Sequence, residues 1–172
     1  MKLSKIILST IAAAALLVTV SCANKPKEAA KEAVPSVTNA VAAENKGPLL
    51  ELNGDSDSGK AGALQTVYFD FNSAQLTEQT KNTLKDNADF LKKSETIEVQ
   101  VEGHADERGS VQYNLALGEK RAKTVKSYLM GLGIKVKRMS TISYGKERPL
   151  TFGHDESSWS KNRRANFVIT TK

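Results

Sequence analysis

A predicted strand, a glycine-containing turn and an amphipathic helix follow one another between residues 96 and 129, and together they constrain the fold more than any other feature. Thr96–Glu102 alternates Ile97, Val99 and Val101 with polar side chains, which is typical of a strand that buries one face. Placed at about 100° per residue, the helix gathers its apolar side chains on one arc. These side chains are Leu115, Leu117, Ala122, Val125, Tyr128 and Leu129. The pattern therefore predicts a helix packed on one face of a sheet.

Two polar residues, Asn114 and Arg121, fall on the apolar side of this predicted helix. A buried guanidinium needs an acceptor, because an unpaired charge in the interior is costly. Asp106, in the turn before the helix, is a candidate acceptor. One interpretation is a structural ion pair that fixes the turn to the helix. The other is a cleft in which two opposite charges bind a zwitterion. The residues by themselves favour the structural pair, because such pairs are common.

The remaining predicted elements complete an α/β domain. The sequence predicts strands over Leu64–Phe71, Met139–Tyr144 and Arg164–Thr170, and a helix that Thr77 caps and that runs to about Lys93. Its buried face is expected to hold Thr80, Leu84, Asn87 or Ala88, and Leu91. Gly131 and Gly133 end the second helix, and a long loop follows the third strand through Pro149, Gly153 and Trp159. The order β-α-β-α-β-β predicts a two-layer α/β sandwich with the helices on one face of a mixed sheet.

The first 21 residues are typical of a secretory signal peptide. Lys2 and Lys5 precede an apolar run over residues 6–20, which is shorter than the roughly 20 residues that span a bilayer. Cys22 follows this run directly and resembles the lipidated cysteine of a bacterial lipobox, so we expect lipidation of Cys22. Residues 22–63 have a polar, alanine-rich composition that predicts a flexible linker. Within it, Leu49–Leu52 is either ordinary linker or a short docking element.

Charge and composition exclude several functions. The chain has 25 basic and 19 acidic residues, a net charge of +6 that includes Lys2 and Lys5 of the predicted signal peptide. This modest excess, with 6% aromatic residues and no nucleic-acid-binding motif, makes nucleic acid an unlikely partner class. A single cysteine excludes an intrachain disulfide and a cysteine-based zinc site. His104 with Asp106 and His154 with Asp155 lack metal-site spacing, and no nucleophile, base or carboxylate pair forms a catalytic pattern. We therefore expect a binding protein without a cofactor, not an enzyme.

Six motifs in one order carry a resemblance to a known family. They are Gly103–Gly109, Tyr113–Asn114, Leu117–Ala122, Ser143–Glu147, Gly153–Glu156 and Lys161–Ala165. The region from about Leu64 to Thr171 resembles the OmpA C-terminal-like domain family, and in particular its peptidoglycan-associated lipoprotein group. The resemblance implies an OmpA-like peptidoglycan-binding domain over residues 64–172.

The resemblance also implies a ligand, and it reverses the preference for a purely structural pair. In this family the domain binds the peptide stem of peptidoglycan at diaminopimelate, whose side chain ends in a carboxylate beside an ammonium. The positions that match the ligand contacts of the family are Phe71, Asn72, Ala105, Asp106, Leu117 and Arg121. Asn72 stands where many relatives carry aspartate, which predicts a weaker contact to the ammonium. Ala105 stands where others carry threonine.

Localisation and partners follow from the same resemblance. It implies a lipid anchor at Cys22 in the outer membrane, a domain that faces the periplasm, the propeller protein TolB as a partner, and a role in envelope constriction during division. The alternative is an OmpA-like lipoprotein that works mainly through protein partners, without TolB.

The sequence leaves two smaller questions open, on Asn114 and on the basic residues before the last strand, and it gives one expectation for His154. Asn114 serves either the ligand or the start of its helix. His154 is expected to fix the long loop. Lys161, Arg163 and Arg164 are either a solvated strand edge or a docking surface for an anionic wall or partner.

Overall fold

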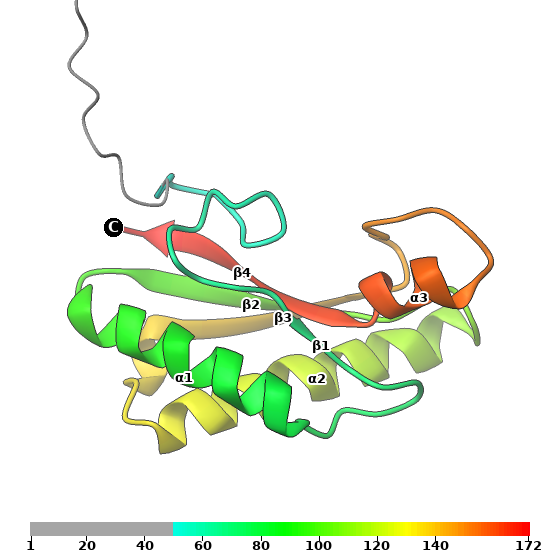
Figure 1. Cartoon of the computed structure of the whole chain (residues 1–172), viewed down its shortest axis with the longest axis horizontal. Coiled ribbons are helices and arrows are strands. Elements are labelled where there is room, and N and C mark those ends of the chain that lie inside the picture. The colour runs from blue at the N-terminus through cyan, green and yellow to red at the C-terminus, as the bar shows by residue number, and fades with distance from the viewer. Residues whose placement is uncertain (1–49) are drawn as a thin grey trace, which may run out of the picture. The chain divides into compact units, whose positions relative to one another are not determined.

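The computed structural model describes residues 50–172, which form a mixed sheet with two long helices packed on one face (Figure 1). The elements are β1 (Val67–Tyr68), α1 (Glu78–Lys93), β2 (Glu98–His104), α2 (Val111–Gly131), the 3-10 helix η1 (Val136–Arg138), β3 (Met139–Gly145), α3 (Glu156–Asn162) and β4 (Arg164–Thr171). The strand order is β1-β4-β2-β3, with β2 and β3 parallel and β4 antiparallel to both β1 and β2. The predicted two-layer α/β sandwich is confirmed.

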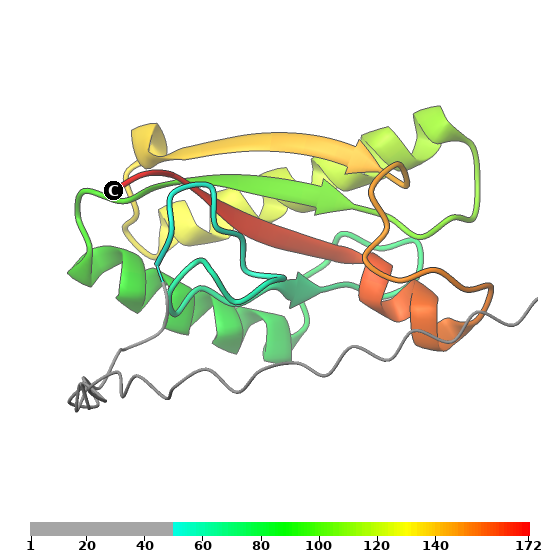
Figure 2. The ribbon, with the colours of Figure 1, turned by 90° about the horizontal axis from the view of Figure 1, so that it is seen from above.

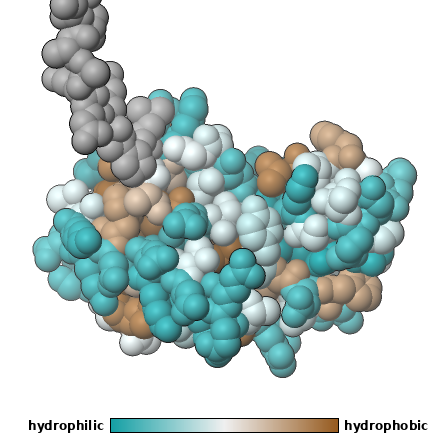
Figure 3. All heavy atoms as spheres, in the orientation of Figure 1, coloured by the Kyte–Doolittle hydropathy of each residue, from teal (hydrophilic) through white to brown (hydrophobic). Residues whose placement is uncertain are grey.

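Helix α1 begins and faces the core as the sequence predicts. The Thr77 hydroxyl accepts a hydrogen bond from the Thr80 N–H at 3.2 Å, which satisfies a donor at the start of the helix. Its buried residues are Thr80, Leu84, Asn87, Ala88 and Leu91. The opposite side of the helix is polar, and the face of the molecule in Figure 3 is mostly hydrophilic with smaller hydrophobic areas.

Helix α2 buries the middle of the predicted arc, and its edge is exposed. Its buried residues are Asn114, Gly118, Arg121, Ala122, Val125 and Leu129, whereas Leu115, which was expected in the core, is 38% exposed. Leu115 lies at the edge of the predicted arc, whereas Gly118 lies near its middle, at about 100° per residue. Gly118 and Gly103 of β2 form a glycine pair in close contact, and a Cβ on Gly103 would lie 1.9 Å from the Gly118 carbonyl oxygen.

Part of the predicted linker is packed onto the sheet. The N–H groups of Asn53 and Ser56 donate to the carbonyls of Ile169 and Phe167 at 2.8 and 2.9 Å, and Ala61 is fully buried. Figure 2 shows this segment alongside β4. The expectation of a flexible linker is therefore wrong for residues 50–63, because backbone hydrogen bonds to β4, side-chain bonds of Ser56 and Asp57, and packing of Leu50 and Ala61 on the core hold them. Cys22 and the predicted signal peptide lie outside the described residues.

Two further elements differ from the prediction. Strand β1 has two paired residues instead of the expected Leu64–Phe71. Its partner β4 begins only at Arg164, and Phe167 of β4 is bonded to Ser56, so only Arg164 and Ala165 pair with β1. Helix α3 replaces part of the predicted long loop, and the Asp155 side chain caps it by accepting from the Ser158 N–H at 2.9 Å. Within residues 50–172, no helix has the length and hydrophobicity that a membrane span requires.

Candidate ligand-binding site

A pocket of about 260 Å³ lies where β2 leads into α2. It is lined by Phe71, Asn72, Asp106, Arg108, Gly109, Tyr113, Asn114, Leu117 and Arg121. Five of the six predicted ligand contacts are therefore brought together from the turn after β1, the β2–α2 loop and the first turns of α2. Ala105 is not in the lining; it is 2% exposed, and its N–H donates to the Gly145 carbonyl at 2.8 Å.

Arg121 is fully buried and binds backbone instead of a carboxylate. Its guanidinium donates to the carbonyls of Ser73, His104 and Asp70 at 2.8, 2.7 and 3.1 Å. Burial, with the nearby charge of Arg163, lowers the pKa of Arg121 to about 10, so the side chain still carries its charge at neutral pH. Arg121 thus connects α2 to the end of β2 and to the turn after β1. The predicted ion pair between Arg121 and Asp106 is wrong.

Asp106 pairs with Arg108 instead. The Arg108 side chain donates from Nε and Nη2 to the two carboxylate oxygens at 3.2 and 2.5 Å, and the Arg108 N–H adds a third bond at 3.1 Å. Arg163 Nη1 lies 3.5 Å from Asp106 Oδ2. Burial opposes ionisation, but these hydrogen bonds and charges outweigh it and hold the pKa of Asp106 below its usual value. Asp106 is therefore a carboxylate at neutral pH.

Arg108 is held between two aromatic rings at the edge of the pocket. Its guanidinium carbon lies 4.0 Å from the ring centroids of Phe71 and of Trp159. The side chain of Arg108 is 30% exposed, so it presents charge to the pocket while the stacking fixes its plane. Sequence reasoning missed Arg108. Its position two residues after Asp106 in a tight turn was the available signal.

Two polar contacts shape the floor of the pocket. The Tyr113 hydroxyl donates to Asn72 Oδ1, and the left-handed backbone at Asn72 is one that asparagine tolerates. The Asn114 side chain donates to the Arg108 carbonyl at 2.9 Å, while Ser110 caps α2. Asn114 therefore fixes the β2–α2 loop and is not the N-cap. Tyr113 was not identified from the sequence.

The loop before α3 is fastened to the β2–α2 loop through Glu107. One carboxylate oxygen of Glu107 lies 2.7 Å from His154 Nδ1 and accepts from Trp159 Nε1 at 2.8 Å. These hydrogen bonds lower the pKa of Glu107, and the bond to Glu107 raises the pKa of His154. The prediction that His154 fixes the long loop is confirmed.

In the basic cluster of Lys161, Arg163 and Arg164, both arginines are buried. Lys161 is exposed, but Arg163 and Arg164 are 6% and 4% exposed. Arg163 donates to the Phe69 carbonyl at 3.0 Å, and Arg164 donates to Asp57 at 2.8 Å. The expectation of a solvated or docking edge is wrong for both arginines, because each is used to hold another segment against β4. In the part of the chain that is described, no group of three or more His, Cys, Asp or Glu side chains is placed to hold a metal.

Comparison with known proteins places this fold and pocket in a family. A family model described as the OmpA family matches residues 68–163. The peptidoglycan-associated lipoprotein of Pseudomonas aeruginosa is 41% identical over 155 residues, which cover 88% of this chain and 90% of that protein. The protein of the same name from Haemophilus influenzae is 46% identical over 100 residues, 58% of this chain and 65% of that protein.

Solved structures agree with this placement. The crystal structure of the peptidoglycan-associated lipoprotein from Burkholderia pseudomallei is 44% identical, with a TM-score of 0.59 over 60% of this chain and 88% of that one. The C-terminal domain of Helicobacter pylori MotB, at 20% identity and a TM-score of 0.59, shares the fold. The chain belongs to the OmpA family and, within it, to the peptidoglycan-associated lipoproteins.

Proposed function

We propose that this chain is a lipoprotein that binds the peptide stem of peptidoglycan non-covalently, at diaminopimelate, and so tethers the outer membrane to the cell wall. The relatives named peptidoglycan-associated lipoproteins support the class of ligand. The observation that carries the proposal is the pocket itself, which presents the carboxylate of Asp106 and the guanidinium of Arg108 side by side. A ligand end that carries both a carboxylate and an ammonium matches this pair of charges.

Arg108 is the group we assign to the ligand carboxylate. A guanidinium has five N–H donors, and Asp106 takes two of them through Nε and Nη2, which leaves Nη1 for a second acceptor. Asp106 has about four lone-pair positions, three of which accept from Arg108. The last is on Oδ2, which also lies 3.5 Å from Arg163 Nη1, and it is the position that we assign to the ligand ammonium. Phe71, Asn72 and Leu117, which also line the pocket, complete the proposed contacts.

Arg121 has a different role in this proposal. Because it donates to three carbonyls, it holds the walls of the pocket in place and adds positive charge behind them. We infer binding without catalysis, since the pocket holds no nucleophile next to a base.

Anchoring and partners complete the proposal. Cleavage after residue 21 would leave Cys22 as the lipidated first residue in the outer membrane, with the domain in the periplasm. More than one acyl chain gives stable anchoring. We place the protein in the Tol-Pal system with a TolB-like partner, and we propose residues 50–172 as the binding domain and residues 22–49 as the segment that connects it to the anchor.

Binding of the full-length chain, in mild detergent, to purified sacculi and to a diaminopimelate-containing stem tripeptide tests the proposal. We expect Asp106→Asn and Arg108→Gln to weaken tripeptide binding by at least roughly tenfold, because each leaves one ligand charge without its partner. Lys120→Ala, on the exposed side of α2, is the matched control. A tripeptide with lysine in place of diaminopimelate lacks the carboxylate and should bind weakly to the wild type.

Two other results of these experiments would contradict the proposal. Release of muropeptides from sacculi would establish an enzyme. Unchanged tripeptide and sacculus binding by both pocket variants would contradict the proposal and favour a protein that works through protein partners. Thermal melts of each variant separate loss of binding from loss of folding.

A further inference from the structure

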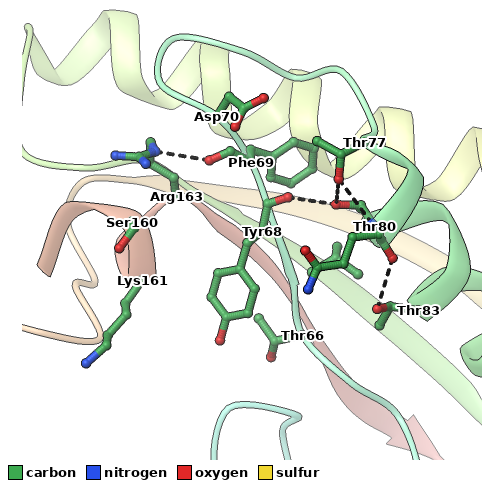
Figure 4. A pocket seen from close by; sticks show the side chains of 12 residues that line it. Thr66, Tyr68, Phe69, Asp70, Thr77, Thr80, Thr83, Ser160, Lys161 and Arg163 are labelled. Atoms are coloured by element: carbon green, nitrogen blue, oxygen red, sulfur yellow. Dashed lines mark hydrogen bonds between the residues drawn. The ribbon is translucent and has the colours of Figure 1, made fainter. Parts of the chain in front are cut away.

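A second hollow, of about 410 Å³, lies beside β1 between the start of α1 and the end of α3 (Figure 4). The side chain of Tyr68 lies in it, between Ser160 and Lys161 of α3 on one side and Thr80 of α1 on the other. Tyr68 is 47% exposed, so one aromatic ring is open to solvent within a hollow whose other side chains are mainly polar. None of the residues proposed above to bind the stem lines it.

Several polar groups in this hollow have no hydrogen-bond partner among residues 50–172. They are the Tyr68 hydroxyl, the Gln79 amide and the Lys161 ammonium. The remaining hydroxyls are fixed by the protein; for example, Thr80 Oγ1 lies 2.9 Å from Thr77 Oγ1 and donates to the Tyr68 carbonyl at 3.0 Å. The hollow therefore has a wall of hydrogen-bonded hydroxyls, and the Tyr68 ring has polar groups around it that are available to bind a ligand.

The two hollows are neighbours. Asp70 lines this one, and the next two residues, Phe71 and Asn72, line the stem pocket. Arg163 reaches both sides, because its Nε donates to the Phe69 carbonyl at 3.0 Å while its Nη1 lies 3.5 Å from Asp106 Oδ2. Arg163 is 6% exposed, and its Nη1 has no hydrogen-bond partner in the described part of the chain. The two hollows thus adjoin along the chain, and the side chain of Arg163 contacts residues that line both.

The chemistry of the hollow favours one kind of ligand. An added β-strand is disfavoured, because the outward carbonyl of Tyr68 already accepts from Thr80 and α1 lies across that edge. One carboxylate, Asp70, offsets one of the two cations in the lining, Lys161 and Arg163, so the net charge of the hollow is small. An exposed aromatic ring with neutral donors and acceptors around it suits a sugar, which offers an apolar ring face, hydroxyls and amide groups.

We propose that this hollow binds the N-acetylated sugar to which the stem peptide is attached. The inference rests on the proposed function, since it concerns the other half of the same ligand. Two amino acids separate that sugar from diaminopimelate in the stem, a reach of roughly 7 Å at about 3.3–3.6 Å per residue. The side chain of Tyr68 stacks on the sugar ring, and Gln79 bonds its amide or hydroxyl groups.

The test compares two ligands by calorimetry on the full-length chain in detergent: the free stem tripeptide and the same tripeptide on its disaccharide. We expect the wild type to bind the disaccharide form about tenfold more tightly, from one stacking contact and one or two hydrogen bonds. Tyr68→Ala and Gln79→Ala should remove most of this difference and leave tripeptide affinity unchanged. Tyr68→Phe keeps the ring and should keep most of the difference.

The outcomes separate the two proposals. If the wild type binds neither ligand, the stem-binding function itself fails. If it binds both equally, or if Tyr68→Ala and Gln79→Ala both retain the preference for the disaccharide form, the sugar site is wrong while stem binding stands. Gln79 is exposed on α1, so its variant tests the site without disturbing the core if Tyr68→Ala folds poorly.

Discussion

Arg121 is the residue on which the geometry of the site depends. A fully buried guanidinium is normally costly, and here three carbonyls from two separate segments compensate for its desolvation. The planar fork of arginine can reach acceptors in several directions, which a single ammonium group on lysine cannot do. The side chain therefore joins α2, the end of β2 and the turn after β1.

Replacement of Arg121 by lysine should destabilise the protein by about 2–4 kcal/mol, because at least one buried carbonyl loses its donor. Urea denaturation monitored by circular dichroism measures this change. Lys120→Ala on the exposed side of the same helix should change stability by less than about 0.5 kcal/mol. An equal, small effect of both substitutions would show that the carbonyl contacts of Arg121 contribute little.

For individual residues, the sequence predicts which polar side chains are buried better than it predicts their hydrogen-bond partners. The helical spacing places Arg121 on the buried side of α2, and the structure agrees. Its partners could not be predicted, because backbone carbonyls carry no residue identity. Asp106 was considered as the partner of Arg121 because it lies in the turn just before the helix, yet Arg108, two residues further along the chain, pairs with it.

At the scale of elements, the glycine pair sets how closely α2 approaches the sheet. A Cβ on Gly118 would lie 2.3 Å from Ser143 Oγ and 2.7 Å from the Gly103 carbonyl oxygen. Neither β2 nor β3 can move away without disturbing the parallel pairing between them. The absence of a side chain at Gly118 is thus a packing requirement and not a consequence of backbone conformation.

Gly118→Ala should destabilise the protein, although alanine is the better helix former by about 1 kcal/mol. We expect a net loss of about 1–3 kcal/mol from overpacking. Gly131→Ala, in the last turn of the same helix, meets no atom within 4 Å and should be neutral or stabilising by up to about 1 kcal/mol. Thermal melts of the two variants compare them directly, and a stabilising Gly118→Ala would contradict the packing argument.

The elements that were predicted from the sequence and those that were not differ in length and in the contacts that stabilise them. Helix α1 has a Thr77 cap and sixteen residues of regular spacing, so local signals were sufficient. Helix α3 has seven residues, and its signal was only Asp155 three positions before Ser158. Residues 50–63 have little hydrophobic periodicity, and backbone bonds to β4 such as Asn53 to Ile169, which hold them together with Leu50 and Ala61, leave no pattern in the sequence.

At the scale of the whole molecule, the site depends on segments that are far apart in the chain. Phe71, Arg108 and Trp159 form one stack, although they come from the turn after β1, the β2–α2 loop and α3. Glu107 fastens the last two of these segments together through His154 and Trp159. The loop before α3 thus supports the side chain that we assign to the ligand carboxylate.

The bond between His154 and Glu107 should make stability depend on pH. The pKa of His154 is raised, so its contribution is complete below its ordinary value of 6.5 and is lost as the pH rises through the raised pKa. The pKa of Glu107 is lowered, so its contribution is complete above 4.5 and is lost as the pH falls through the lowered pKa. Both contributions are therefore complete only between pH 4.5 and 6.5.

His154→Gln should lower the melting temperature relative to the wild type near about pH 5.5 and have a much smaller effect near about pH 9, where histidine is neutral. Thermal melts of both proteins at the two pH values measure the difference. In a Glu107→Gln background, the same histidine substitution should lose its pH dependence, because the charged partner is absent. An equal shift at both pH values, or a pH dependence that persists without Glu107, would mean that His154 acts through contacts other than this ion pair.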